Sequence, residues 1–152
     1  MIVDVSVIAP EGEVLCGSDP CEVLQIDEED VRCEVPVSYD LKVSIVSGRL
    51  IADGRLWTEV KFRCSRCAEF FRLDVKDSAF KCVVDILANV QTVDLTEEMR
   101  EAIILAFPIY GVCRNGCKGL CASCGMNLNS GECDCREETS GPWDVLDELE
   151  TD

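Results

Sequence analysis

The 152-residue sequence contains no histidine. Without an imidazole the chain cannot build a histidine-dependent catalytic triad, or the zinc motifs H-E-x-x-H and H-x-E. A catalytic zinc also keeps an open coordination position beside an acid–base partner. We therefore expect that any metal site in the chain is closed and structural.

Basic residues are also scarce, with 14 Lys and Arg against 30 Asp and Glu and a net charge of -16. Phosphate backbones and anionic lipids should repel such a chain unless its basic residues cluster. No apolar run approaches the roughly 20 residues of a membrane span. The start of the chain, MIVDVSVIAPEGEVL, has no basic region typical of a signal peptide. These features predict a cytoplasmic protein, in a compartment where disulfides are uncommon.

Cysteine, in contrast, is abundant, with twelve residues in the chain. In a reducing compartment this points to metal or redox chemistry. Isolated cysteines are expected to be reduced packing residues; these are Cys16, Cys21, Cys33 and Cys82. Six others crowd together with several glycines, and one pair forms C-x-x-C followed by glycine, the pattern of a metal knuckle. These six are the candidate ligands: Cys113, Cys117, Cys121, Cys124, Cys133 and Cys135.

With no histidine available, a four-ligand site should be made of cysteine alone, and thiolates select zinc or iron–sulfur. A closed zinc site is the favoured interpretation. Cys64 and Cys67 form a second tier of candidate ligands. Either four of the six clustered cysteines bind one ion, or Cys64 and Cys67 join them to give eight ligands and two ions. The spacing leaves both arrangements open.

Two redox alternatives follow from the same cysteines. Cys117, Cys121 and Cys124 have the spacing of a radical S-adenosylmethionine cluster, but too few residues follow for the β/α barrel of those enzymes. Cys64-Ser-Arg-Cys67 could be a thiol–disulfide pair. Redox enzymes of the thioredoxin type place that pair at a helix N-terminus, whereas the flanks here predict strands.

An α+β fold is expected from the remaining pattern. Residues 37–87 alternate between apolar and polar side chains, which predicts an antiparallel β-sheet, curled toward a barrel. Leu50, Ala52, Leu56, Val60 and Phe62 share the buried parity, and the C-S-R-C sequence brackets a hairpin turn. A first strand near MIVDVSVIA, a strand over residues 31–37 and a further strand over residues 79–87 complete this prediction.

One main helix is predicted over residues 95–107, with Asp94 and Glu97 as a capping box and Pro108 at its end. The sequence thus divides into an α+β domain (1–110), a cysteine-rich zinc module (111–136) and an acidic C-terminal tail (137–152). In the tail, Trp143, Leu146 and Leu149 fit one face of a short helix.

Positive charge is concentrated in residues 49–76, which hold seven basic and four acidic residues. Near the C-S-R-C turn and between the candidate ligands, four basic side chains could contact RNA or a protein partner: Arg63, Arg66, Arg114 and Lys118. An ordinary charged sheet face would have the same composition. The acidic remainder of the chain could equally hold a basic ribosomal protein.

Three blocks resemble the YceD family, called large ribosomal RNA subunit accumulation protein. They are GRLIADGRLWTEVKFRCSRCAEFF, VDLTEEMREAIILAFP and CKGLCASCGMNLNSGECDC, followed by the terminal segment SGPWDVLDEL. The C-S-R-C sequence matches the family's C-x-R-C, and residues 113–135 match its cysteine-rich ending, which some members lack. Gly141-Pro142-Trp143 departs from the family's usual Asp-Pro-Arg. The likeness runs over roughly residues 40–150, and residues 1–35 match only loosely.

The resemblance implies a non-enzymatic factor that supports synthesis, processing or accumulation of 23S ribosomal RNA, and so assembly of the large ribosomal subunit. It implies ribosomal RNA or ribosome-assembly proteins as partners, with no catalytic residue, small-molecule substrate or membrane. Two alternatives remain: a zinc-containing acidic adaptor for a basic ribosomal protein, and a thiol-based redox or metal sensor.

Overall fold

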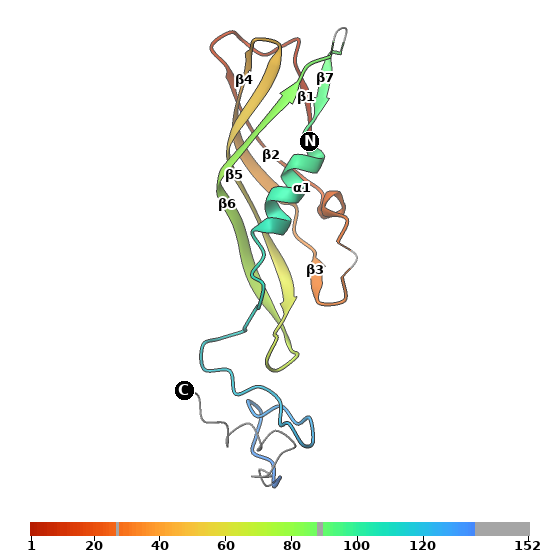
Figure 1. Cartoon of the computed structure of the whole chain (residues 1–152), viewed down its shortest axis with the longest axis vertical. Coiled ribbons are helices and arrows are strands. Elements are labelled where there is room, and N and C mark those ends of the chain that lie inside the picture. The colour runs from red at the N-terminus through yellow and green to blue at the C-terminus, as the bar shows by residue number, and fades with distance from the viewer. Residues whose placement is uncertain (27, 88–89, 136–152) are drawn as a thin grey trace, which may run out of the picture.

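The computed structural model describes residues 1–26, 28–87 and 90–135. Long antiparallel strands form the body, one helix lies across a face of the sheet, and the cysteine-rich segment extends from one end (Figure 1). The elements are β1 (Ile2–Asp4), β2 (Glu13–Asp19), the 3-10 helix η1 (Cys21–Leu24), β3 (Val31–Cys33), β4 (Val37–Val46), β5 (Arg49–Arg63), β6 (Phe70–Asp85), β7 (Thr92–Asp94) and α1 (Thr96–Leu105). The predicted tail helix lies outside the described residues.

The main sheet has five strands and is open. β5 pairs with β6 on one side, and with β4 and then β3 on the other, while β2 pairs with the far side of β4. Within the described residues β6 pairs only with β5, so β2 and β6 do not meet to close the sheet. The predicted antiparallel sheet is confirmed, but the barrel-like curling is wrong. The predicted strand over residues 79–87 is the second half of β6.

The predicted alternation in β5 is confirmed by burial. Leu50, Ala52 and Leu56 are fully buried and Val60 is almost so. The pairing of β5 with β6 shifts register just after Gly54. On the other side of β5, a Cβ at Gly54 would lie 2.1 Å from the carbonyl oxygen of Asp40 in β4. Only glycine therefore fits where β4 and β5 approach so closely.

Helix α1 contributes Met99 and Ile103 to the core. The predicted helix is confirmed, but the predicted capping box is not formed. The N-cap residue is Leu95, and the Asp94 carboxylate accepts the backbone N–H of Thr96 at 3.0 Å. Glu97 instead accepts from the Arg100 guanidinium at 2.8 Å. The carboxylate of Asp94, the residue before the N-cap, therefore accepts from the Thr96 N–H, which has no partner within the helix.

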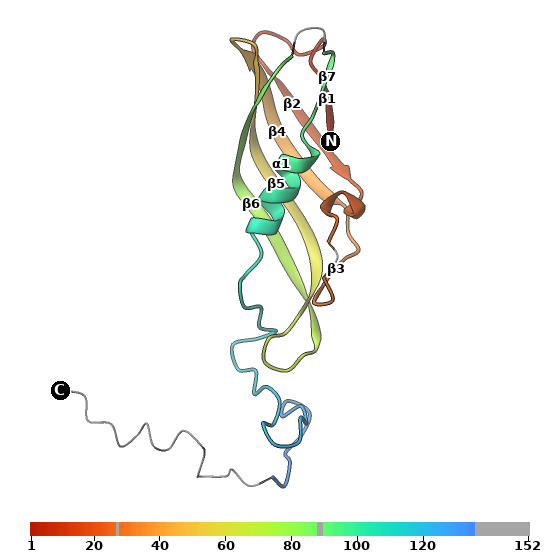
Figure 2. The same cartoon turned by 45° about the vertical axis from the view of Figure 1, so that its right-hand side comes forward.

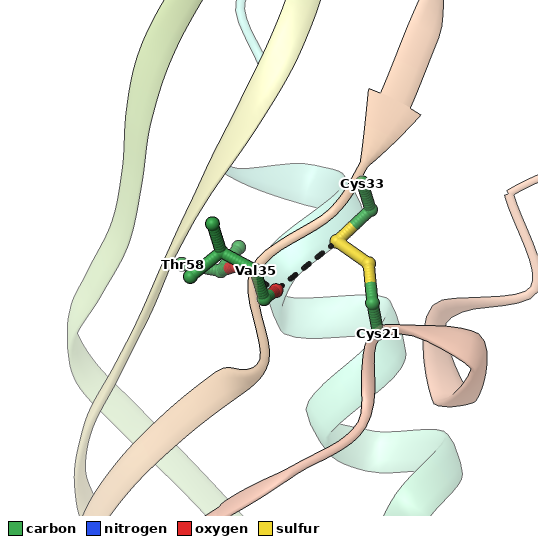
Figure 3. The surroundings of a disulfide bond; sticks show 4 residues. All are labelled: Cys21, Cys33, Val35 and Thr58. Carbon is green, nitrogen blue, oxygen red and sulfur yellow. Dashed lines mark hydrogen bonds between the residues drawn. A yellow bond between two sulfur atoms is a disulfide. The ribbon is translucent and has the colours of Figure 1, made fainter.

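Two cysteines predicted to be isolated are joined. Cys21 in η1 and Cys33 in β3 form a disulfide, and the Cys33 sulfur lies 3.4 Å from the carbonyl oxygen of Val35 (Figure 3). The prediction of reduced packing residues is therefore wrong for this pair. The predicted strand over residues 31–37 also breaks here, because β3 ends at Cys33 and β4 begins at Val37.

The N-terminal part of the chain contributes more sheet than the sequence indicated. β2 pairs with β4 along its whole length, and the short strand β1 pairs with β7 in a separate two-stranded sheet.

No helix among the described residues is long and apolar enough to cross a membrane.

Candidate metal centre

Eight cysteines gather into two groups of four. The hairpin cluster consists of Cys64, Cys67, Cys113 and Cys117, and the terminal cluster consists of Cys121, Cys124, Cys133 and Cys135. The first pair of the hairpin cluster comes from the turn between β5 and β6, and its second pair comes from the C-terminal segment, which lies beyond that turn (Figure 2). The C-S-R-C sequence thus lies at a hairpin turn, as predicted.

The turn of the hairpin cluster is a compact knuckle. The Cys64 backbone N–H donates to the Glu69 carbonyl at 2.9 Å, and the Ala68 N–H donates to the Cys64 carbonyl at 2.9 Å. Ala68 adopts a positive φ of 60°. This left-handed conformation costs a residue other than glycine roughly 1–2 kcal/mol. Both sulfurs of C-x-x-C point to the same side of this turn, toward the C-terminal segment, and contact the other pair of the cluster.

The terminal cluster repeats this knuckle. The Cys121 N–H donates to the Met126 carbonyl at 2.8 Å, and the Gly125 N–H donates to the Cys121 carbonyl at 2.9 Å. The offsets along the chain are the same as in the hairpin cluster. Gly125 has a φ of 73° at the position that corresponds to Ala68. The predicted glycine-assisted turn under the sulfurs is therefore present here.

Each cluster has the size of a site for one ion. All four sulfur atoms of a cluster lie within 4.8 Å of one another. In the hairpin cluster the sulfurs of Cys64 and Cys117 are 3.9 Å apart, and those of Cys67 and Cys113 are also 3.9 Å apart. A tetrahedral ion with bonds of about 2.3 Å to sulfur would separate its ligands by roughly 3.8 Å. Both clusters are therefore geometrically able to bind a metal ion.

The surroundings of the two clusters differ in burial. Cys64, Cys67 and Cys117 are buried, with exposed fractions of 2%, 4% and 5%. In the terminal cluster Cys124 and Cys135 are exposed. The hairpin cluster is thus shielded by the protein, whereas the terminal cluster faces solvent on one side.

Within the hairpin cluster the thiols differ in acidity. Burial opposes ionisation of Cys64, but the backbone N–H groups of Cys113 and Cys67 among others outweigh it and lower the Cys64 pKa to about 6. Burial and the neighbouring thiols raise the pKa of Cys113 to about 12. The Cys64 thiol therefore ionises far more readily than the Cys113 thiol, and metal binding by Cys113 would release a proton.

The thiols of the terminal cluster also differ in acidity. The backbone N–H groups of Cys124 and Ser123 lower the pKa of Cys121 to about 6. Hydrogen bonding to the Cys124 and Cys121 sulfurs raises the pKa of Cys135 to about 12. In both clusters the first cysteine of the knuckle has a pKa lowered to about 6, because backbone N–H groups donate to its sulfur.

A side chain outside the predicted set also contacts sulfur. The amide nitrogen of Asn129 lies 3.4 Å from the Cys117 sulfur, and this hydrogen bond lowers the Cys117 pKa. Asn129 belongs to the loop between Cys124 and Cys133. Its signal in the sequence is the Asn-x-Asn pattern between two ligand pairs, which a search for sulfur ligands and basic residues passes over.

The four predicted contact residues lie around the hairpin cluster, and all of them are exposed. Arg63 pairs with Asp30 at 3.3 Å. Arg66 donates to the Cys117 carbonyl at 3.3 Å, and Arg114 donates to the Asn129 side chain at 2.9 Å. Lys118 alone of the four has no side-chain partner among the described residues. The arginines therefore hold the chain together around the cluster, and their contact with RNA stays a prediction.

Residues 81–150 match the family model of the Large ribosomal RNA subunit accumulation protein YceD. A relative from Arabidopsis thaliana, named large ribosomal RNA subunit accumulation protein YCED homolog 1, chloroplastic, is 38% identical over 62 residues, covering 40% of this chain and 19% of the relative. The Zea mays protein of the same name is 26% identical, covering 73% of this chain and 52% of the relative.

An uncharacterized protein of Mycobacterium tuberculosis is 30% identical over 127 residues, covering 74% of this chain and 61% of the relative. The chain thus spans between 19% and 61% of the length of these relatives. No solved structure matches it significantly. The family resemblance carried by the sequence blocks is confirmed, and the matched family is named for the accumulation of large-subunit ribosomal RNA.

Proposed function

We propose that this chain, whose residues 81–150 belong to the YceD family, is a non-enzymatic factor that supports the accumulation of 23S ribosomal RNA and assembly of the large subunit. The observation that carries this proposal is the family match, which includes α1 and all six clustered cysteines. The relatives' names describe RNA accumulation and no reaction.

Zinc is the ion that we propose for both clusters, with the eight cysteines as its ligands. Each cluster offers four sulfur donors and no other ligand type, which suits a tetrahedral Zn²⁺. The sulfur separations of 3.9 Å suit one ion held by all four thiolates. In a [2Fe–2S] or [4Fe–4S] cluster the four cysteines are divided among two or four irons, which requires a wider arrangement. Four protein ligands leave no open position, so the zinc ions would be structural.

Metal analysis tests the first part of the proposal. The purified full-length protein should contain two zinc ions per chain by inductively coupled plasma and native mass spectrometry. Replacing Cys121 and Cys124 together by Ser should leave one ion. A protein with no metal when purified anaerobically in reductant would refute the zinc proposal, whatever the cellular role.

The cellular role is tested by deletion and complementation. Cells that lack this chain should have a lower ratio of large-subunit to small-subunit ribosomal RNA, and the wild-type gene should restore it. The same ratio in deleted and wild-type cells would refute the proposed role. A reaction that purified protein performs on RNA precursors would refute its non-enzymatic part.

The direct partner is proposed to be ribosomal RNA, contacted at the hairpin-cluster end of the molecule through Lys118 and the neighbouring arginines. Crosslinking in cells should recover large-subunit RNA with the wild-type protein, and Lys118→Glu should reduce that yield. Lys42→Glu on the exposed side of β4 serves as the matched control and should have no effect.

A groove between β6 and α1 favours a second candidate, the acidic adaptor for a basic ribosomal protein. Its volume is about 350 Å³, and its lining includes Asp77, Glu98, Glu101 and one base, Lys81. One buried carboxylate oxygen of Glu98 accepts no hydrogen bond from the described residues. If crosslinking recovers ribosomal protein and no RNA, with loss on Glu98→Gln, the adaptor function replaces direct RNA binding.

The redox-sensor alternative is less well supported by the geometry. Cys64 and Cys67 are buried and converge with two further sulfurs. A dithiol switch, in contrast, needs only its own pair and access to oxidant. A Cys64–Cys67 disulfide formed under mild oxidant, with loss of the RNA phenotype, would favour the sensor.

A further inference from the structure

Asn129 lies where the two clusters meet. It is carried by the loop that Cys124 and Cys133 of the terminal cluster enclose, yet its side chain contacts the hairpin cluster. Its amide nitrogen donates to the Cys117 sulfur at 3.4 Å and to the Asn127 side-chain oxygen at 2.8 Å. The loop of one cluster thus supplies a hydrogen-bond donor to a sulfur of the other.

The orientation of the Asn129 amide is determined by its other partners. Its oxygen accepts from the Arg114 guanidinium at 2.9 Å and from the Lys118 backbone N–H at 3.0 Å. Both of these groups can only donate, so the oxygen must face them and the nitrogen must face sulfur. The side chain therefore uses both of its N–H donors and accepts two hydrogen bonds at its oxygen.

Backbone contacts connect the same loop to the hairpin. The Leu128 N–H donates to the Gly119 carbonyl at 2.9 Å, and the Leu120 N–H donates to the Arg66 carbonyl at 3.1 Å. Gly119 has a φ of 80°, and a Cβ there would lie 3.2 Å from the Arg66 carbonyl oxygen. The chain from Gly119 to Asn129, which carries Cys121 and Cys124 of the terminal cluster, is thus folded back beside the hairpin.

We propose that Asn129 is a positioning residue that couples the two clusters, so that metal binding at them is positively cooperative. The inference rests on the metal sites of the proposed function. An ion in the terminal cluster orders the loop and places the Asn129 amide against Cys117, where it stabilises the negative charge of a metal-bound thiolate. Because coupling is reciprocal, an ion in the hairpin cluster favours binding in the terminal cluster by the same factor.

Zinc titrations of the full-length protein against a competing chelator test this proposal, with native mass spectrometry to count ions per molecule. In wild type, protein with one bound zinc ion should be rarer than two independent sites would give. Asn129→Leu, which keeps the size but removes the hydrogen bonds, should bind zinc at the hairpin cluster about 10–100-fold more weakly, as outer-shell substitutions do. Ser130→Ala, an exposed neighbour, is the matched control and should match wild type.

Asn129→Asp separates sulfur contact from mere support of the loop. Aspartate retains the oxygen that accepts from Arg114 and Lys118 but places a second, negative oxygen against the Cys117 sulfur. The proposal therefore predicts that Asp weakens zinc binding more than Leu does. If Asn129 only supports the loop, Asp should be the milder change, and that order would overturn the proposal.

A second comparison uses the terminal cluster itself. Replacing Cys121 and Cys124 by Ser should weaken zinc at the hairpin cluster, and adding Asn129→Leu to that protein should weaken it little further. Equal effects of Asn129→Leu in both backgrounds would overturn the coupling. Two ions that bind independently in wild type would also overturn this inference alone, whereas no bound ion would overturn the proposed function with it.

Discussion

Removing zinc should unfold the C-terminal segment and leave the sheet intact. The main core consists of buried apolar residues that all lie between Met1 and Ile103. The separate cluster at the hairpin end has three buried residues, and all of them are cysteines. Ordering the chain costs about 1–2 kcal/mol per residue, which three buried thiols cannot offset over residues 111–135. Structural zinc contributes about 10–16 kcal/mol of apparent binding free energy per ion, and here that would be folding free energy.

Hydrogen exchange read by mass spectrometry measures this directly. With a strong zinc chelator, the amides of Leu120, Gly125 and Leu128 should lose protection, because their acceptors lie within the metal-organised segment or on the hairpin. Peptides from β4 and β5 should keep theirs, since their N–H groups pair within the sheet. The same chelator saturated with zinc is the control and should change neither region.

Two outcomes would refute this reasoning. If the C-terminal amides keep their protection after both ions have left, the segment is held by contacts other than metal. If the β4 and β5 peptides lose protection at the same chelator concentration, the sheet depends on the metal and the two parts unfold as one unit. Metal content measured on the same samples shows that the ions have been removed.

Three further predictions concern single positions. Leu56 is fully buried, whereas Val14 is 62% exposed. Leu56→Ala should therefore lower the free energy of unfolding in urea by about 2–5 kcal/mol. Val14→Ala should change the same free energy by less than about 0.5 kcal/mol, and equal losses would contradict the assigned core. Burial and then Glu98 raise the pKa of Cys82 from an ordinary 9.0 to about 11. The neutral thiol is therefore favoured in the folded state, and its contribution is complete below pH 9 and lost between pH 9 and 11. Cys82→Ala should flatten the fall in stability over that window, and an alkylation midpoint of Cys82 near 9 would contradict the shift. Gly125→Ala should weaken zinc at the terminal cluster roughly fivefold through about 1 kcal/mol of left-handed strain, while Ala68→Gly should not weaken the hairpin cluster. Chelator competition measures both, and similar losses in the two variants would contradict the strain.

Much of the fold could be predicted because its signals are local. The alternation from Leu50 to Phe62 reports one buried face, and helical spacing around Met99 reports another. The disulfide between Cys21 and Cys33 had no such signal, because their spacing fits no motif and the pair forms only when β3 returns beside η1. Closure of the sheet likewise depends on which strands pair over long distances, which alternation does not encode.

In the candidate site, too, features set by neighbouring residues could be predicted, whereas features set by contacts between distant residues could not. A knuckle followed by glycine could be recognised at Cys121, but the equivalent turn at Cys64 has alanine in the left-handed position. Alanine carries no turn signal. The division of the cysteines could not be predicted either. Cys117 is separated by three residues from both Cys113 and Cys121, so spacing allows it to join either neighbour. Contacts with the distant hairpin place Cys117 beside Cys64, and the hydrogen bond from Leu120 to the Arg66 carbonyl is one of them.

Two knuckles with the same backbone hydrogen bonds are thus placed in unequal surroundings, and we expect this difference to give them different roles. Four thiolates and one Zn²⁺ carry a net charge of about -2. At the hairpin cluster Arg66 and Arg114 lie close to that charge and three of the four cysteines are buried. At the terminal cluster Glu132 and Asp134 stand among the cysteines and two sulfurs are exposed, so we expect an ion to bind less strongly there. We therefore expect the hairpin cluster to anchor the segment to the sheet, and the terminal cluster to control whether Asn129 reaches Cys117, and with it the strength of the anchor.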